Sequence, residues 1–258
     1  MISMRDYQVE PLQVLSFGGG TQSTAMLHLI HDGKLPKPDI VVFADTGSEL
    51  PETIEHVFQV AKPFVEQVLQ VPFHVVARGA PLHVEYRESG YVPMAGIGSC
   101  TAKFKIRPQR HLIREIVGNG RGKLLAECWL GITTDEVRRR TESDVKWCGI
   151  RYPLLDDYPM SRDECIQLND SRGWEVIKSG CFVCPHQGRN TWMKLRETHP
   201  DLFAIALDLE NHVRDEMDER GRPLRVGLLR DQWLSELDDL PDRWNEDSTC
   251  DSGGGCFI

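Results

Sequence analysis

The chain has 258 residues, of which 40% are hydrophobic and 27% are charged, the composition of an ordinary globular protein with room for one sizeable core. Its formal net charge of −9 argues against a broad surface that coats nucleic acid, and its apolar runs are too short to cross a bilayer. Because the first residues carry no basic segment followed by an apolar one, we expect no secretory signal, a cytoplasmic location and no membrane partner.

Strand and helix signals alternate through the first half of the chain. Short apolar runs rich in β-branched residues predict strands at 12–17, 39–47, 72–78 and 123–132. Longer stretches between these runs predict helices at 22–33, 49–69 and 107–118. This order predicts an α/β fold whose mostly parallel sheet carries helices on both faces.

The pattern changes after about residue 146. A loop is followed by a predicted helix at 162–170 with Ser161 as its N-cap, by a loop with two cysteines, by a helical region at 190–220 and by a polar tail. We therefore divide the chain into an α/β core at 11–145 and a smaller helical C-terminal part at 146–258, within one continuous domain.

The segment "VLSFGGGTQSTAMLHLI" (14–30) joins a predicted strand to a predicted helix through three consecutive glycines. Such a junction presents backbone N–H groups and the positive end of a helix dipole to an anion. Two well-known phosphate loops do not match, because G-x-x-x-x-G-K-[ST] requires a lysine and G-x-G-x-x-G a third glycine that this stretch lacks. We therefore expect an anion site of another type at 16–23.

Within this segment, "SFGGGTQS" resembles the pyrophosphatase-type loop (PP-loop) S-F-S-G-G-x-D-S of the adenine nucleotide alpha hydrolases. Gly19, Gly20 and Ser23 match that loop, whereas Gly18 stands in place of a serine and Gln22 in place of an aspartate.

Three further segments resemble the phosphoadenosine phosphosulfate (PAPS) reductase branch of that superfamily and follow in its order. "DTGSELPET" (45–53) resembles D-T-G-x-x-F-P-E-T, and "CTAKFKIRP" (100–108) resembles C-x-x-x-x-K-x-x-P. "GITTDEVRRR" (131–140) resembles G-x-R-x-x-[QE]-S-x-x-R. The four motifs together cover residues 14–140 and imply a PP-loop nucleotide-binding core.

The resemblance implies that this core binds an adenine nucleotide, either ATP with Mg²⁺ or a sulfonucleotide such as PAPS or adenosine phosphosulfate (APS). Thr133 replaces the family's arginine, so an anion contact would pass to Arg138 or Arg139. Asp45 ends a predicted strand, where open α/β sheets bind ligands, although a simple turn aspartate is the alternative. The residues expected at the nucleotide are Ser16, Phe17, Gly18, Gly19, Gly20, Thr21, Gln22, Ser23, Asp45, Thr46, Gly47, Gly131, Arg138 and Arg140.

The eight cysteines are not interpreted as structural disulfides, because we expect no secretory signal. Cys128 and Cys165 lie in strand-like and helix-like surroundings and are expected to be buried small hydrophobic residues. The spacing Cys181-x-x-Cys184 lets two thiolates from one turn bind one metal, but it also suits a redox pair or two packed thiols.

The resemblance of the segment 100–108 to a cluster-bearing motif adds Cys100 as a third ligand. For the fourth ligand Cys256 is the first choice, Cys250 the alternative and Cys148 the third choice, while His186 could also ligate zinc. Four thiolates suit a [4Fe–4S] cluster or Zn²⁺, and the resemblance favours the iron–sulfur cluster.

The resemblance also implies an enzyme that works on sulfur, with Lys105, Arg140 and Cys256 as catalytic candidates. It would be an oxidoreductase that reduces PAPS or APS with a reductant protein such as thioredoxin, or a transferase that activates an acceptor with the ATP α-phosphate before sulfur transfer. The acceptor would be a nucleic acid or a small molecule. The reductases' E-C-G-[LI]-H segment is missing from the tail "TCDSGGGCFI", which favours sulfur transfer.

A non-catalytic alternative is a nucleotide-binding, metal-stabilised module for recognition or regulation. The substitutions at Gly18, Gln22 and Thr133 support this alternative, because each departs from the motif that the enzymes share.

Overall fold

The computed structural model describes residues 10–95, 99–120, 122–176, 179–223, 226–230 and 232–239. Its centre is a parallel sheet with the strand order β3-β2-β1-β4-β5. The strands are β1 (Leu12–Ser16), β2 (Ile40–Asp45), β3 (Phe73–Ala77), β4 (Ala126–Trp129) and β5 (Cys148–Arg151). The predicted α/β class is confirmed. The strand order changes direction between β1 and β4, the place where open α/β sheets bind ligands at the carboxyl ends of their strands.

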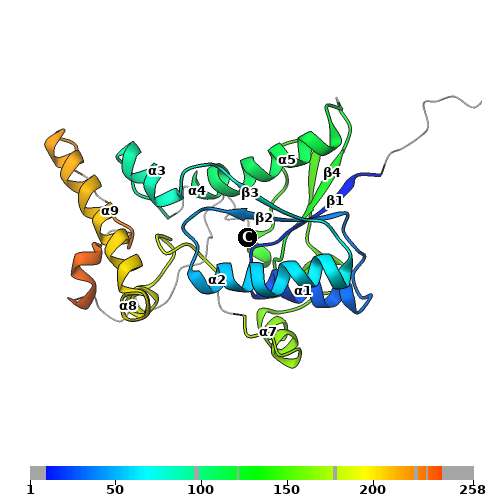
Figure 1. Ribbon diagram of the computed structural model, residues 1–258. Helices are drawn as coiled ribbons and strands as arrows, with labels where there is room; N and C mark the ends of the chain where they lie inside the picture. Colours follow the sequence, from blue (N-terminus) through cyan, green and yellow to red (C-terminus); the bar gives the residue numbers. More distant parts are fainter. Residues whose placement is uncertain are drawn as a thin grey trace, which may run out of the picture.

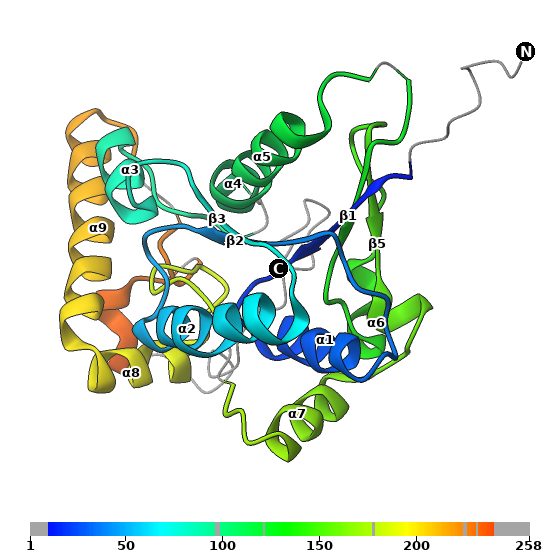
Figure 2. The same cartoon turned by 45° about the vertical axis from the view of Figure 1, so that its right-hand side comes forward.

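Helices cover both faces of the sheet because its strands are apolar on both sides. Leu15 and Phe17 belong to the cluster packed by α1 (Thr21–His31) and α7 (Arg162–Ser171), whereas Val14 packs on the opposite face with Ile113 of α5 (Arg107–Val117). Figure 1 shows α5 on one side of the strands and α1, α2 and α7 on the other, and Figure 2 shows the same layers after a turn.

The helix predicted at 49–69 is present but irregular. It begins as α2 (Pro51–Glu55) and continues through two π-helical stretches, His56–Ala61 and Phe64–Leu69. Pro63 separates the two stretches and has no N–H to donate, which interrupts the regular α-helical hydrogen bonds.

The remaining helices lie in the connections between strands and in the C-terminal part of the chain. These are α3 (Leu82–Ser89), α4 (Ser99–Thr101) with a π-helical stretch at Ala102–Ile106, a 3₁₀ turn at Thr134–Arg139, α6 (Pro153–Asp156), α8 (Arg189–Thr198), α9 (Pro200–Glu219) and a 3₁₀ turn at Leu234–Asp239. The predicted helical region 190–220 is thus two helices, because Pro200 disfavours helical backbone at the preceding residue. Helices α3, α8 and α9 share a separate apolar cluster and stand to one side of the sheet in Figure 1.

The sequence interpretation missed β5, which pairs with β4 and extends the sheet past residue 145, where we placed the end of the α/β core. Its four residues, Cys-Gly-Ile-Arg, are too few to show a strand pattern. The predicted N-cap Ser161 is confirmed: its Oγ accepts a hydrogen bond from the Glu164 N–H, and the Glu164 carboxylate accepts one from the Ser161 N–H.

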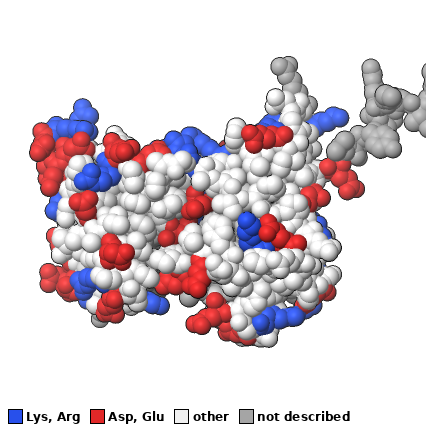
Figure 3. All heavy atoms as spheres, viewed as in Figure 1, with Lys and Arg blue, Asp and Glu red and all other residues white. Residues whose placement is uncertain are grey.

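The surface agrees with the acidic composition. On the face shown in Figure 3, Lys and Arg are scattered among Asp and Glu and do not merge into a broad basic area. Of the helices in the described ranges, none has the length and apolar character needed to cross a membrane.

Candidate functional site

The glycine loop connects β1 to α1 beside the point where the strand order changes direction. Gly19 has φ = +73°, and a Cβ there would lie 2.9 Å from Cγ2 of Val57. Gly20 is the N-cap of α1 and, having no side chain, caps none of the first N–H groups of that helix. The loop therefore directs the N-terminus of an 11-residue helix to the carboxyl edge of the sheet, an arrangement that favours an anion.

Gly20 also makes a close contact within the protein that the sequence did not reveal. A Cβ at Gly20 would lie only 2.5 Å from Oγ of Ser179, which precedes the two cysteines. The cysteine loop, defined here as 179–184, therefore packs against the glycine loop. No local pattern could have indicated this contact, because the two residues are 159 positions apart in the sequence (179 minus 20).

The segment after β4 completes this edge of the site. A Cβ at Gly131 would lie 3.1 Å from the Gln22 Cβ, so the segment approaches the first turn of α1 closely. The Glu136 carboxylate accepts hydrogen bonds from Gln22 Nε2 at 3.1 Å and from Thr133 Oγ1 at 3.3 Å, and Arg139 Nη1 pairs with it at 2.5 Å. The two residues that depart from the family motifs, Gln22 and Thr133, thus contact the same carboxylate.

The arginines of this segment have different surroundings. Arg139 is largely buried beside Glu136 and lies in the same network as Thr133. Arg140 instead pairs with Asp156 of α6 at 2.6 Å and lies over the Tyr152 ring, with half of its side chain exposed.

Asp45 and Ser16 make contacts within the protein. Asp45 Oδ1 accepts a hydrogen bond from the Gly47 N–H at 2.7 Å, the contact of a turn-forming aspartate. Ser16 Oγ donates to Gln109 Oε1 of α5 at 2.8 Å. Phe17 is fully buried and packs edge-on against Phe73 at 5.9 Å between ring centres. These contacts give the three residues structural roles at the edge of the glycine loop.

The cysteine loop adds a short antiparallel pairing to the segment that follows β2. Glu49 is bridged to Cys181, the Leu50 N–H donates to the Gly180 carbonyl at 3.1 Å, and the Phe182 N–H donates to the Ser48 carbonyl at 2.9 Å. The Cys184 N–H donates to the Cys181 carbonyl at 3.1 Å, so the two cysteines lie on one tight turn.

Polar groups surround the Cys181 thiol. Its Sγ lies 3.2 Å from Thr46 Oγ1 and 3.6 Å from Glu49 Oε1, and Lys105 Nζ lies 3.7 Å from that same Glu49 oxygen. Burial and the Glu49 charge raise the pKa of Cys181 well above that of an ordinary thiol. The structure thus brings together Thr46, Lys105 and Cys181. Glu49, which sequence reasoning missed, connects them.

The other predicted metal ligands are placed less fully. Cys100 packs against the same apolar cluster as Cys181, whereas Cys148, the third choice, packs on the α5 face of the sheet in a different cluster. Among the described residues, no three Cys, His, Asp or Glu side chains are grouped so that they could hold a metal ion. Cys250 and Cys256 lie outside the described residues. Cys181 and Cys184 therefore provide a two-thiol turn whose further ligands would come from elsewhere.

Part of the sequence matches a known protein family. Residues 13–121 match the sequence model of the phosphoadenosine phosphosulfate reductase domain. The chain is 25% identical over 245 residues to the uncharacterized protein MJ0973 of Methanocaldococcus jannaschii, an alignment that covers 90% of this chain and 51% of that protein. The chain therefore spans about half the length of this curated relative.

Two solved structures share 13% sequence identity with the chain. The PAPS reductase from Candida auris, in its phosphate complex, aligns with a TM-score of 0.44 over 65% of this chain and 76% of that one. The U34-tRNA thiolase NcsA from Methanococcus maripaludis, with its [4Fe–4S] cluster, aligns with a TM-score of 0.43 over 93% of this chain and 84% of that one. Residues 13–121 thus match the phosphoadenosine phosphosulfate reductase domain, and the motifs and the parallel sheet of this segment agree with that match.

Proposed function

We propose that the chain binds an adenine nucleotide at the glycine loop and catalyses a reaction at sulfur beside the cysteine loop. The observation that carries the proposal is the contact between these loops, in which Ser179 packs against Gly20. The same cysteine loop pairs with the segment after β2 through Glu49 and Cys181. A phosphate at the N-terminus of α1 would therefore lie next to the cysteine turn.

The nucleotide phosphates are assigned to the first turn of α1, with Arg139 as the nearby cation. Gln22 replaces an acidic residue of the family motif, which removes one negative charge from the phosphate site. Its amide is held by Glu136, whose own charge is balanced by Arg139. Mg²⁺ would accompany ATP and offset the phosphate charge.

A metal centre at the cysteine loop is the second part of the proposal. Cys181 and Cys184 would supply two thiolates, Cys100 a third and Cys256 the fourth, with Cys250 as the alternative. The two-thiol turn fits a [4Fe–4S] cluster or a zinc ion, since each of them binds pairs of cysteine thiolates at the C-x-x-C spacing. A bound cluster would supply electron transfer. Lys105 would stabilise negative charge beside Cys181, because its ammonium lies within ion-pair distance of Glu49.

Sulfur transfer is the reaction that we favour over sulfonucleotide reduction, because the reductases' cysteine-containing tail motif is missing. An acceptor hydroxyl would attack the α-phosphate of ATP and release pyrophosphate, and a sulfur donor would then displace AMP. The competing reduction would convert PAPS or APS to sulfite with electrons from a dithiol protein.

Parallel assays on anaerobically purified protein distinguish these reactions. ATP, Mg²⁺, a sulfide donor and an RNA or small-molecule acceptor should yield pyrophosphate and AMP, whereas PAPS with reduced thioredoxin should yield sulfite if the chain is a reductase. Nucleotide binding without either product would support the recognition module. If neither ATP nor PAPS binds, the proposal is wrong.

A further inference from the structure

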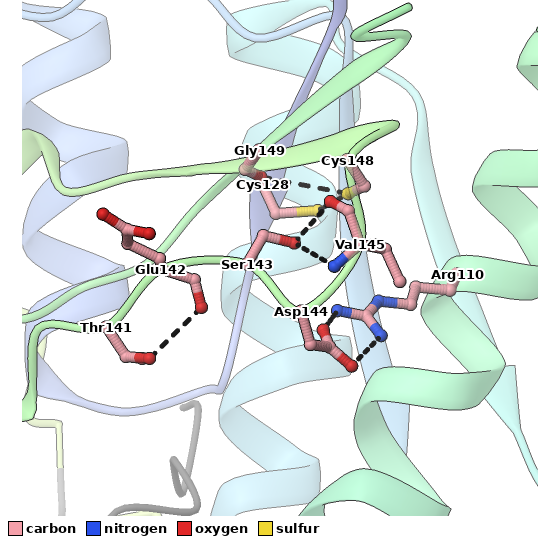
Figure 4. Close-up of polar contacts among 9 residues, drawn as sticks. All are labelled: Arg110, Cys128, Thr141, Glu142, Ser143, Asp144, Val145, Cys148 and Gly149. Atoms are coloured by element: carbon pink, nitrogen blue, oxygen red, sulfur yellow. Dashed lines mark hydrogen bonds and ion pairs between the residues drawn. The ribbon is translucent and has the colours of Figure 1, made fainter. Parts of the chain in front are cut away.

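Two cysteines that the proposed function does not use lie side by side in the sheet. Cys128 of β4 and Cys148 of β5 have their sulfur atoms 3.3 Å apart, and both belong to the apolar face beneath α5 (Figure 4). In the register of the two strands, Ala126 stands beside Cys148 and Cys128 beside Ile150. The two cysteines are therefore diagonal neighbours on one face, with no side chain between their thiols.

Positive charge from α5 acts on this pair. Arg110 forms an ion pair with Asp144 in the loop before β5, as Figure 4 shows. The contact with the Cys128 thiol is the largest effect on Cys148 and lowers its pKa. The charges of Arg110 and Arg114 act in the same direction, while burial and Asp144 oppose them. The same contact with Cys148 and burial raise the pKa of Cys128. The contact between the two sulfur atoms thus lowers the pKa of one thiol and raises that of the other, an asymmetry that is also found in reactive cysteine pairs.

We propose that Cys128 and Cys148 form a reversible disulfide when a hydroperoxide oxidises the protein. The Cys148 thiolate attacks one peroxide oxygen, and the O–O bond breaks to leave a sulfenic acid on Cys148 and a hydroxide ion. The Cys128 thiol then attacks the Cys148 sulfur and expels water. In total, two thiols and one hydrogen peroxide give one disulfide and two waters, and a dithiol reductant restores the thiols by exchange.

The position of the pair allows this closure. The sulfur atoms must approach from 3.3 Å to about 2.0 Å. Among the described strands β5 pairs only with β4, so it can shift without breaking a second ladder. The residues that follow β4 lead directly to Gly131 and the Glu136 network. The disulfide would therefore form within the strand that precedes this part of the proposed nucleotide site.

Cys165 provides a matched control. Cys165 is fully buried, and its neighbours in the core are apolar side chains of the opposite face of the sheet. Burial raises the pKa of Cys165 to about 12, so its thiol resists oxidation.

Peptide mapping of the full-length protein tests the proposal. The protein is treated with hydrogen peroxide, its remaining thiols are alkylated with N-ethylmaleimide in denaturant, and it is digested with trypsin. Tryptic cleavage separates the cysteines into peptides 124–138 and 147–151. We expect these peptides to become linked with the loss of two hydrogens, and dithiothreitol added before alkylation to separate them.

The variants Cys148→Ser and Cys128→Ser should each abolish the linked peptide, whereas Cys165→Ser should leave it unchanged. The proposal is overturned if both wild-type peptides stay separately alkylated at peroxide concentrations that oxidise other cysteines of the chain. It is also overturned if Cys148 is converted to sulfinic acid or linked to another cysteine. Because the wild-type map needs no variant, a substitution that fails to fold does not obscure the result. This outcome is independent of nucleotide binding and so of the proposed function.

Discussion

Glu136 contacts both of the residues that depart from the resembled motifs near the proposed nucleotide site. Gln22 and Thr133 replace an aspartate and an arginine, and both donate to the Glu136 carboxylate, which also pairs with Arg139. Relative to those motifs, an acidic and a basic position are both neutral here, and the neighbouring Arg139 is the cation that we propose for the phosphates. The sequence predicted that Arg138 or Arg139 would supply this cation, but it could not predict that Glu136 holds the network, because the contacts join segments far apart in the chain.

Gly20 provides the sharpest test at the scale of single residues. In Gly20→Ala the new methyl group would overlap Oγ of Ser179, so this side chain, and with it the cysteine loop, must shift. We expect nucleotide affinity to fall by about tenfold, within the 1–3 kcal/mol typical of overpacking. Titration calorimetry with ATP and with PAPS measures this affinity in the wild-type protein and the variant. The double variant Gly20→Ala with Ser179→Gly should recover most of the affinity, because the atom that the methyl group overlaps is gone. No recovery would show that Gly20 matters for another reason.

The titration of the buried His28 should make the stability of the protein depend on pH. His28 is buried against Trp174, and burial lowers its pKa from 6.5 to about 4 in the folded protein. The unfolded chain therefore binds the proton first as pH falls, and the free energy of unfolding should decrease from about pH 6.5 to pH 4, by up to about 3 kcal/mol. Urea unfolding at a series of pH values measures this slope. His28→Gln should reduce this slope without removing it, because burial also lowers the pKa of His56 and His83, whereas His111→Gln, at an exposed position on α5, should leave it unchanged.

At the scale of elements, the strands and helices most accessible to prediction were those with long, regular patterns. Strands β1 to β4 and helices α1, α5 and α7 lie where the apolar runs and the Ser161 cap predicted them. β5 was missed because four residues do not establish a period, and the division at residue 145 followed from that omission. The Ser179 and Glu49 contacts could not be predicted, since they depend on how the cysteine loop folds back onto the sheet.

Glu210 of α9 holds the end of the described chain in place. Its fully buried carboxylate accepts hydrogen bonds from the N–H groups of Leu228 and Leu234, each at 2.7 Å. Glu210→Ala would leave both donors buried without this acceptor, so we expect a loss of about 2–5 kcal/mol in the free energy of unfolding. Denaturant unfolding measures the loss. Asp208 lies on α9 as well, and its exposed carboxylate pairs with Arg87. Asp208→Ala should lower the free energy of unfolding by less than about 1 kcal/mol. Equal effects from the two variants would contradict this role.

At the scale of the whole molecule, the C-terminal helices carry the cysteine loop to the edge of the sheet. Phe182 and Val183 belong to the same apolar cluster as Trp192 of α8 and Leu209 of α9, while Cys181 is bridged to the segment after β2. The fold thereby places a two-thiol turn beside the glycine loop, although the two loops come from opposite halves of the chain.

Metal content should follow the proposed ligands. Cys181→Ser and Cys184→Ser should each lower bound iron or zinc, measured by elemental analysis of anaerobically purified protein, and should lower stability as well. Cys165→Ser should retain full metal content, because Cys165 lies in the core on a face of the sheet away from the cysteine loop. The metal contents of Cys256→Ser and Cys250→Ser show which of these two cysteines is the fourth ligand. Full metal content in both Cys181→Ser and Cys184→Ser would remove the centre from the proposal.

The central claim is that nucleotide and cysteine loop share one site, and the rate of metal release to a chelator tests it most directly. The rate is measured as ATP with Mg²⁺, or PAPS, is added in increasing concentration. A nucleotide seated on α1 beside Ser179 should shield the cysteine turn, so the rate should fall by about tenfold, with its midpoint at the nucleotide Kd. A release rate that stays constant up to about 1 mM of either nucleotide, a concentration that detects even weak binding, would contradict the claim.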